Sequence, residues 1–368
     1  IKIHHTMKYD KKYFFKRQIT LSEIGELGQQ KLQDAKVLVV GCGGLGSPIA
    51  VYLASSGIGK LHLIDFDTVA ITNLHRQVFY SLDDVDHYKS ECLSNFIQQR
   101  APFTQVSFST QALTKENASM LISEYDIIVD GTDSLPTKYL LNDVCVLEEK
   151  PLVYGSLYKF DGYVSSFNLL QEDGSYSTNL RDAFPVMNTY VPNCKEAGTL
   201  NAIVGMIATA QVNEVLKIIT GIGKPLANKL LVYNALQNRQ LKMKISSIIE
   251  KEQIASLFKI ETYFDAACGT QNPDWQISPE ELKKRLSDTE RRVSLELIAV
   301  VPNLKLPFKV HQTIPIQEFY ANTFTVDEKK TYVMVCQRGF NSYKATEQLK
   351  EKHPTLNVLN LTGGISNY

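Results

Sequence analysis

A glycine-rich segment constrains the fold of this chain more than any other feature, and its glycines are Gly41, Gly43, Gly44 and Gly46. The segment follows a β-branched run, Lys36–Val40, and precedes a stretch with helical character, Ser47–Ser56. A strand that ends in G-x-G-x-x-G and leads into a helix is typical of a nucleotide-binding βαβ unit, because the glycines let backbone N–H groups approach phosphate. Asp65 ends the next predicted strand, where a carboxylate accepts hydrogen bonds from ribose hydroxyls. We therefore expect a nucleotide site at this loop.

An uncharged stretch, Val37–Gly59, is long enough to cross a bilayer. Its glycines and the pair Ser47-Pro48 favour the strand–loop–helix interpretation instead. The chain has 39 Lys+Arg and 39 Asp+Glu, so it carries no net charge that would attract nucleic acid or an anionic membrane. We expect neither as a partner.

Cysteine usage points to a reducing compartment. None of the six cysteines forms a C-x-x-C pair, which argues against a structural zinc site and a thioredoxin-type motif. Scattered single cysteines and the lack of a secretory h-region favour a cytoplasmic protein.

Strands alternate with helices up to residue 154, and this pattern predicts a Rossmann-like, doubly wound sheet. The strands are expected at Lys36–Val40, Lys60–Asp65, Val106–Phe108, Asp126–Asp130 and Pro151–Tyr154. Beyond Gly155 the alternation of Gly162–Leu169 and a closing hairpin predict antiparallel strands, so the sheet is mixed. We expect a nucleotide-binding domain over residues 7–248, a linker over 249–275, and a small α/β domain over 276–368.

Polar side chains follow the second and fourth of these strands: Asp67, Asn73, Arg76, Gln77, Lys89 and Asp133. Strand carboxyl ends are where open α/β sheets bind ligands. The glycine loop with Asp65 alone would also suit an NAD-dependent oxidoreductase. However, a triphosphate needs cations and hydrogen-bond donors, and a nicotinamide pocket does not. We therefore expect ATP, with Asp133 holding Mg²⁺ on the phosphates.

These motifs together resemble the MoeB/ThiF/HesA family, relatives of the ubiquitin-activating enzymes, over about Tyr13 to Lys244. The resemblance rests on the segments Arg17-Gln18, Gly41–Gly46, Asp65–Gln77, Thr132-Asp133, Pro151–Gly155 and Cys194–Gly198. It implies adenylation of the C-terminal glycine of a ubiquitin-like sulfur-carrier protein that ends in Gly-Gly. Asp65 resembles the ribose-binding acid, while Asn73, Arg76 and Lys89 resemble groups around the triphosphate. Asp133 resembles the catalytic, Mg²⁺-associated aspartate.

The resemblance also implies a homodimer, because Arg17 resembles an arginine that reaches the phosphates of the other subunit. Cys194 resembles a loop cysteine that takes part in sulfur transfer. The chain departs from the family where many members carry two zinc-binding cysteine pairs, since Thr178–Arg181 and Ile245–Glu250 contain none. Lys138 stands where the family has arginine, which changes the geometry available for ion pairing.

The C-terminal segment resembles a rhodanese domain, because Cys336-Gln-Arg-Gly-Phe-Asn-Ser342 lies between a predicted strand and a predicted helix. A persulfide on Cys336 would be held by loop N–H groups and the helix dipole. Such a protein needs a persulfide donor such as a cysteine desulfurase. Its carrier would serve molybdopterin, thiamine or thiolated-tRNA synthesis.

Two alternatives remain open at this point. The first is a binding protein that keeps ATP and the carrier but has lost sulfur transfer. The missing zinc cysteines favour it, and so do Gln337 and Asn341, which stand where arginines are common in rhodanese loops. The second is the NAD-dependent oxidoreductase, for which the cluster of Arg76 and Lys89 would be dispensable.

Overall fold

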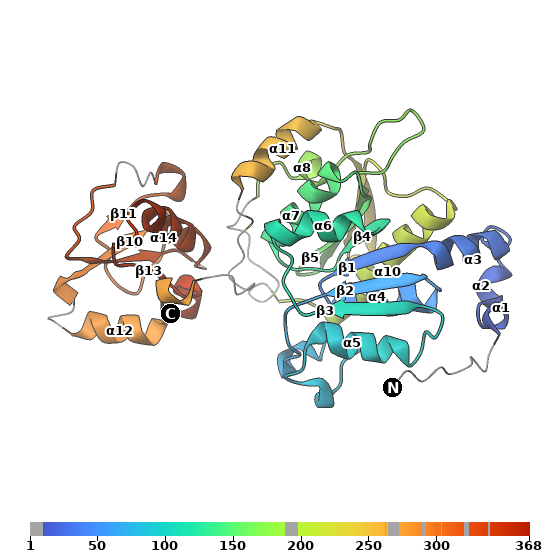
Figure 1. Cartoon of the computed structure of the whole chain (residues 1–368), viewed down its shortest axis with the longest axis horizontal. Coiled ribbons are helices and arrows are strands. Elements are labelled where there is room, and N and C mark those ends of the chain that lie inside the picture. The colour runs from blue at the N-terminus through green and yellow to red at the C-terminus, as the bar shows by residue number, and fades with distance from the viewer. Residues whose placement is uncertain are drawn as a thin grey trace. The chain divides into compact units, whose positions relative to one another are not determined.

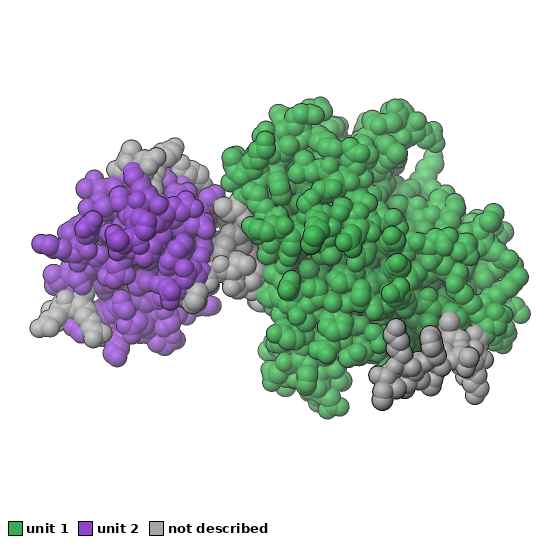
Figure 2. Space-filling model, in the orientation of Figure 1, with its two compact units in different colours: residues 1–263 green, residues 264–368 purple. Residues whose placement is uncertain are grey.

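The computed structural model describes residues 10–187, 198–261, 263, 272–288, 292–302, 304–319, 324–337 and 339–368. It divides into two compact units, Ile1–Tyr263 and Phe264–Tyr368, coloured separately in Figure 2. Each unit is described by itself.

The first unit is built on an eight-stranded sheet in the order β3-β2-β1-β4-β5-β6-β7-β8. Strands β1 to β5 run parallel, and β6 to β8 continue the sheet antiparallel. Strands β2 and β3 lie on one side of β1, and β4 lies on the other. The order in which successive strands are added to the sheet therefore reverses between β1 and β4. The strands are β1 (Lys36–Val40), β2 (Lys60–Ile64), β3 (Gln105–Ser109), β4 (Ile127–Asp130), β5 (Leu152–Tyr158), β6 (Asp161–Phe167), β7 (Lys229–Asn234) and β8 (Arg239–Lys244).

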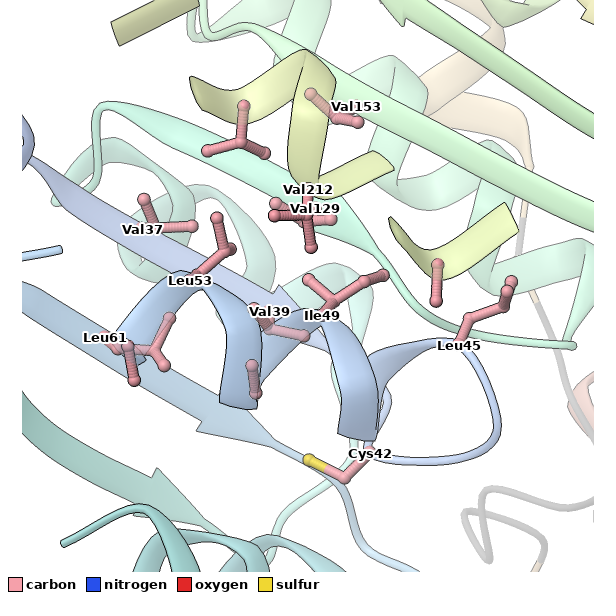
Figure 3. Close-up of a cluster of buried hydrophobic side chains, with 14 of the residues drawn as sticks. Val37, Val39, Cys42, Leu45, Ile49, Leu53, Leu61, Val129, Val153 and Val212 are labelled. Carbon is pink, nitrogen blue, oxygen red and sulfur yellow. The ribbon is translucent and has the colours of Figure 1, made fainter. Parts of the chain in front are cut away.

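Helices cover both faces of this sheet (Figure 1), as the continuous apolar runs of its central strands β1 and β4 require. Figure 3 shows Ile49 and Leu53 of α4 packed toward Val39 of β1 in the core beneath α4, α5 and α10. A second core lies on the opposite face, beneath α6, α7 and α11. The helices are α1 (Lys11–Phe14), α2 (Lys16–Ile19), α3 (Gly25–Asp34), α4 (Gly46–Ser55), α5 (Lys89–Gln98), α6 (Lys115–Ser123), α7 (Leu135–Leu147), α8 (Leu180–Ala183), α10 (Asn201–Thr220) and α11 (Lys251–Ile260).

Two of these helices differ from what their composition suggests. By length and hydropathy α10 could cross a membrane, but it packs against α4, β5 and β6 in the core. The charged segment that becomes α11 was expected to belong to a linker. Instead it forms a helix of the first unit, because Ile254 is fully buried and α11 packs on α7.

The second unit holds a five-stranded parallel sheet in the order β11-β10-β12-β13-β9. One apolar cluster joins this sheet to α14 through Ala345 and Leu349, and another joins it to α12 through Leu282. The elements are β9 (Gln276–Ile277), α12 (Pro279–Ser287), β10 (Leu295–Ala299), β11 (Gln312–Thr313), β12 (Thr331–Val335), α14 (Phe340–Lys352) and β13 (Val358–Leu361).

Candidate nucleotide site and cysteine loop

The glycine loop lies between β1 and α4, at the point where the chain reverses direction across the sheet. Open α/β sheets bind ligands at such a switch point. Gly41 and Gly46 pack directly against each other and against Gly131, the residue after β4: a Cβ on Gly46 would lie 1.7 Å from the Gly41 carbonyl oxygen. Gly41 has φ +87°, which favours glycine. The glycines therefore bring the two loops that follow β1 and β4 into contact.

Donors in this loop remain available to a ligand. In the described part of the chain the backbone N–H groups of Gly43, Gly44 and Leu45 have no acceptor. They precede the first turn of α4, whose dipole favours an anion at this end. Gln77 lies against Gly43, and its buried Oε1 has no partner among the described residues. The loop thus has the geometry of a phosphate cradle, and a side chain on Gly44 would collide with Val204 of α10.

Asp65, directly after β2, fastens the loop. Its Oδ2 accepts from the Cys42 N–H at 2.6 Å, and its Oδ1 accepts from the Asp67 N–H at 2.8 Å. Each oxygen keeps a second lone pair for a ribose hydroxyl. Burial raises the pKa of Asp65, while the nearby Lys89 ammonium and the two N–H groups act in the opposite direction.

Lys89 begins α5 and is buried, with its ammonium 2.8 Å from the Asp67 carboxylate. Its backbone N–H also donates to the Asp67 carbonyl at 2.9 Å. Tyr80, which the sequence analysis did not single out, joins this corner to the glycine loop: its hydroxyl donates to the Cys42 carbonyl at 2.6 Å and approaches the Lys89 carbonyl. Only the fold could reveal this link, because a lone tyrosine gives no sequence signal.

The remaining predicted polar residues of this site flank the loop. The Asn73 side chain caps a short 3₁₀ turn, Ile71–Asn73, by accepting from the Ala70 N–H at 3.2 Å. Arg76 is half-buried beside Gly44, and its guanidinium donates to the Thr72 carbonyl at 3.0 Å. The same guanidinium nitrogen also lies 3.1 Å from Nε2 of His75. Because both contacts involve this one nitrogen, most of the five guanidinium donors remain open.

Asp133 follows β4 in the loop that touches the glycine loop through Gly131. Its carboxylate is exposed and has no hydrogen-bond or ion-pair partner in the described ranges. The next residue, Ser134, caps α7 by accepting from the Thr137 N–H at 3.2 Å. A free carboxylate beside a phosphate cradle has the chemistry to hold a divalent cation on phosphate oxygens.

Arg17 lies away from this cluster, on α2. The neighbouring Gln18 donates to the Ser56 carbonyl at 3.0 Å, which places α2 at the C-terminal end of α4. The glycine loop is at the other end of that ten-residue helix, about 15 Å away at 1.5 Å per residue. The structure therefore does not bring Arg17 to the glycine loop of its own chain. Cys194 lies outside the described residues.

A carboxylate next to the cysteine-free segment Thr178–Arg181 bonds to the second cysteine-free segment, Ile245–Glu250. Asp182 accepts from the N–H groups of Ile248 and Ile249 at 2.7 and 3.1 Å. Next to it, Arg181 forms a buried two-point ion pair with Asp143. The described part of the chain holds no group of three or more His, Cys, Asp or Glu arranged for a metal ion.

Cys336 occupies the corresponding switch between strand and helix in the second unit. It follows β12, is 3% exposed, and its sulfur accepts from the Gly339 N–H at 3.1 Å. The Ser342 hydroxyl, in the first turn of α14, also lies 3.1 Å from the sulfur. A thiolate or persulfide here would meet these donors and the positive end of the helix dipole.

Fold and site together define a nucleotide-binding α/β protein with a second unit that presents a cysteine at a helix N-terminus. The sequence profile of the ThiF family matches residues 15–253, and the chain belongs to that family.

Relatives extend beyond this segment. A "sulfur carrier protein adenylyltransferase" of Thermus thermophilus is 40% identical over 225 residues, which cover 61% of this chain and 83% of the relative. An "adenylyltransferase and sulfurtransferase MOCS3" of Culex quinquefasciatus is 34% identical, over 91% of this chain and 81% of the relative. Among solved structures, a complex of E. coli MccB shares the fold, with 24% identity and a TM-score of 0.54 over 64% of this chain and 72% of that one.

Proposed function

We propose that this protein is an adenylyltransferase that uses ATP and Mg²⁺ to activate the C-terminal glycine of a ubiquitin-like sulfur carrier, and that its second unit then supplies sulfur. The observation that carries the first half is the convergence of the glycine cradle, Asp65, Arg76 and Asp133 on the switch point of a ThiF-family fold. Relatives whose names give both activities support the second half.

The residues divide the chemistry of the first step among them. Asp65 would hold the ribose, and the N–H groups of the glycine loop would hold phosphate oxygens. Arg76, Lys89, Asn73 and Gln77 would offset the negative charge that opposes a carboxylate attacking the α-phosphorus. Mg²⁺ on Asp133 would neutralise charge on the phosphates. The carboxylate oxygen of the carrier then bonds to the α-phosphorus while pyrophosphate leaves, which gives an acyl adenylate.

Sulfur transfer would follow on Cys336. The terminal sulfur of a Cys336 persulfide, loaded by a protein donor such as a cysteine desulfurase, attacks the acyl carbon and AMP leaves. The product is an acyl disulfide on Cys336. Attack by the Cys194 thiol on the Cys336 sulfur releases the carrier thiocarboxylate and leaves a Cys194–Cys336 disulfide, which a cellular thiol reduces. This chemistry suits the reducing cytoplasm.

A homodimer completes the proposal. Arg17 lies on α2, near the end of α4 that is opposite the glycine loop, and it is exposed and has no partner among the described residues. If Arg17 serves the phosphates, it must serve those of a second copy. Mixing Arg17→Ala protein with inactive Asp133→Ala protein tests this directly, because a mixed dimer regains one intact site. Recovery of ATP–pyrophosphate exchange on mixing supports the dimer. A mixture that stays as inactive as the two separate variants contradicts it.

The antiparallel end of the large sheet offers a docking face for a folded carrier. Met243 pairs with Leu230, and Leu241 pairs with Val232, so these four side chains share one face of the sheet. Leu241 and Met243 are each about half exposed, at 49% and 50%. We expect Met243→Asp to weaken carrier binding, while Met120→Asp, at a 72% exposed methionine on α6, leaves it unchanged.

ATP–pyrophosphate exchange with carriers ending in Gly-Gly tests the adenylation step. Wild-type protein should exchange and Asp133→Ala should not, while Asp133→Ala retains its fold because that carboxylate has no described partner. Absence of exchange with every carrier would sink the proposal. Thiocarboxylate formation that requires Cys336 would separate the sulfur-transferring enzyme from a protein that only adenylates or binds the carrier.

A further inference from the structure

A buried ion pair lies directly behind the loop that presents Asp133. The Lys138 ammonium is 2.8 Å from Oδ2 of Asp130, and the two side chains are 5% and 0% exposed. Lys138 also donates to the Gly155 carbonyl of β5 at 2.7 Å. Neither side chain can reach a ligand in solvent, so this pair does not belong to the binding surface.

The second oxygen of Asp130 holds the loop itself. Its Oδ1 accepts from the backbone N–H of Thr132 at 3.0 Å and from the Thr132 hydroxyl at 2.8 Å. Gln211 of α10 donates to the Asp130 carbonyl at 2.8 Å, which fixes the end of β4 from the other side. One carboxylate therefore connects the first turns of α7 to the residue that precedes Asp133.

The loop is consequently held at both ends. Asp130 fixes Thr132 on one side of Asp133, and Ser134 is fixed on the other side as the N-cap of α7. Gly131 adds a third constraint through its contact with Gly41 and Gly46. Asp133 itself is exposed and unpartnered within the described residues, so the position of its backbone sets the region that its carboxylate can reach.

A buried ion pair is a poor way to gain stability, because apolar residues of similar volume usually do as well. Its geometry is demanding, however, and it can select one backbone conformation. We propose that Lys138, acting through Asp130, is a positioning residue for Asp133. It therefore governs the rate of adenylyl transfer rather than the affinity for ATP. This inference rests on the proposed function.

Lys138→Met tests it. Displacing a catalytic group by about 1 Å costs up to about 100-fold in rate, so kcat for ATP–pyrophosphate exchange should fall about 10- to 100-fold. The KM for ATP should stay within about threefold, since the glycine loop, Asp65 and Arg76 are untouched. Lys138→Arg retains a cation opposite Asp130 and should restore most of the rate.

Thr132 provides a milder, matched pair of variants in case Lys138→Met folds poorly. Thr132→Val removes the hydroxyl that Asp130 accepts, whereas Thr132→Ser keeps it. The valine variant should lose kcat and the serine variant should not. Equal kcat in Lys138→Met and wild type would overturn the inference. So would a parallel loss of kcat and ATP affinity in Lys138→Met that Lys138→Arg also shows.

Hydrogen exchange of the amides of residues 131–134 in the free protein separates this inference from the proposed function. Lys138→Met and Thr132→Val should speed exchange there, whatever reaction the enzyme performs. If wild type shows no ATP–pyrophosphate exchange but these amides lose protection in the two variants, the proposed function fails and the positioning role stands. If protection is unchanged in both variants, the positioning role fails.

Discussion

The Lys89 ammonium and the Asp67 carboxylate form an ion pair with a separation of 2.8 Å, in which the lysine is buried and the aspartate is 46% exposed. Lys89, which we propose binds a phosphate, is thus already paired with a half-exposed carboxylate at the site. Because the exposed carboxylate is screened by water, the pair itself contributes little to stability. Its consequence is positional, since Asp67 fixes where the buried cation can meet a phosphate.

Lys89→Met should therefore weaken ATP binding selectively. Loss of one cation near the phosphates should reduce ATP affinity about tenfold or more, while adenosine, which lacks phosphate, should bind within about twofold of wild type. Calorimetric titration with both ligands measures the difference. Lys89→Arg serves as the control. Equal loss of ATP and adenosine binding would mean that Lys89 only supports the fold.

Gly46→Ala should abolish nucleotide binding. The added Cβ would lie 1.7 Å from the Gly41 carbonyl oxygen, a backbone atom that cannot move without opening the contact between the two loops. Gly205→Ala is the matched control, because that glycine lies within α10 and has open space around it. Replacing a helical glycine with alanine should stabilise the protein by about 0.5–1 kcal/mol. Thermal unfolding and ATP titration of both variants check this contrast.

Nucleotide binding should be sensitive to acid through Asp65. Burial raises the pKa of this carboxyl above its ordinary value of 3.8. Considered alone, Asp65 therefore stabilises the free fold fully below pH 3.8, and this contribution is lost as the pH rises through the folded pKa. The ionised form is the better acceptor for ribose hydroxyls, so ATP affinity should fall on acidification, starting at a higher pH than for an ordinary aspartate.

Asp65→Asn provides the check on this pH dependence. The variant should bind ATP weakly at neutral pH and lose the acid-dependent change, which titrations from pH 7 to about 4.5 would show. An unchanged pH profile in Asp65→Asn would assign the acid sensitivity to another group.

Cys92 should be unreactive although it is partly exposed. It lines a hollow of about 390 Å³ with Asp84, His87, Phe96 and Arg100, and burial together with the Asp84 carboxylate raises its pKa to about 11. The thiolate is the reactive form, so alkylation by iodoacetamide at pH 8 should be slow. Asp84→Asn should speed it. Peptide mass spectrometry measures both rates, and fast labelling of wild-type Cys92 would contradict the expectation.

Local sequence patterns predicted much of the fold, and the exceptions have identifiable causes. The strand Lys36–Val40 has the bounds that the sequence predicts. The pattern of Lys115–Ser123 predicts a helix, and the observed α6 has the same bounds. The amphipathic pattern of Asp83–Arg100 also predicts a single helix, and this prediction is wrong at its start. Asp86 adopts φ 69°, and the right-handed helix begins only at Lys89. β5 runs on to Tyr158, beyond its expected end, because pairing with β6 extends it.

The sequence likewise indicated one part of the candidate site and could not indicate another. Residue types and their strand-end positions indicated the acid, the glycines and the cations, since those features are local. Sequence could not show that Lys89 is held by Asp67, or that Lys138 reaches Asp130 and Gly155, because such pairings depend on which strands become neighbours. The glycine loop and the polar residues at the strand ends could therefore be located from sequence, and the network behind them could not.

Ser342 should control the reactivity of Cys336. The Ser342 hydroxyl is fully buried and lies 3.1 Å from the sulfur, so it can donate to a thiolate or persulfide. Hydrogen bonds to charged groups contribute about 1.5–3 kcal/mol, and Ser342→Ala should slow alkylation and persulfide loading of Cys336 by about tenfold or more at neutral pH. Thr346→Val is the matched control: it also deletes a buried hydroxyl, one that donates to the Ser342 carbonyl at 2.9 Å and not to the sulfur. If both variants slow Cys336 equally, packing of α14 rather than the Ser342 hydroxyl sets its reactivity.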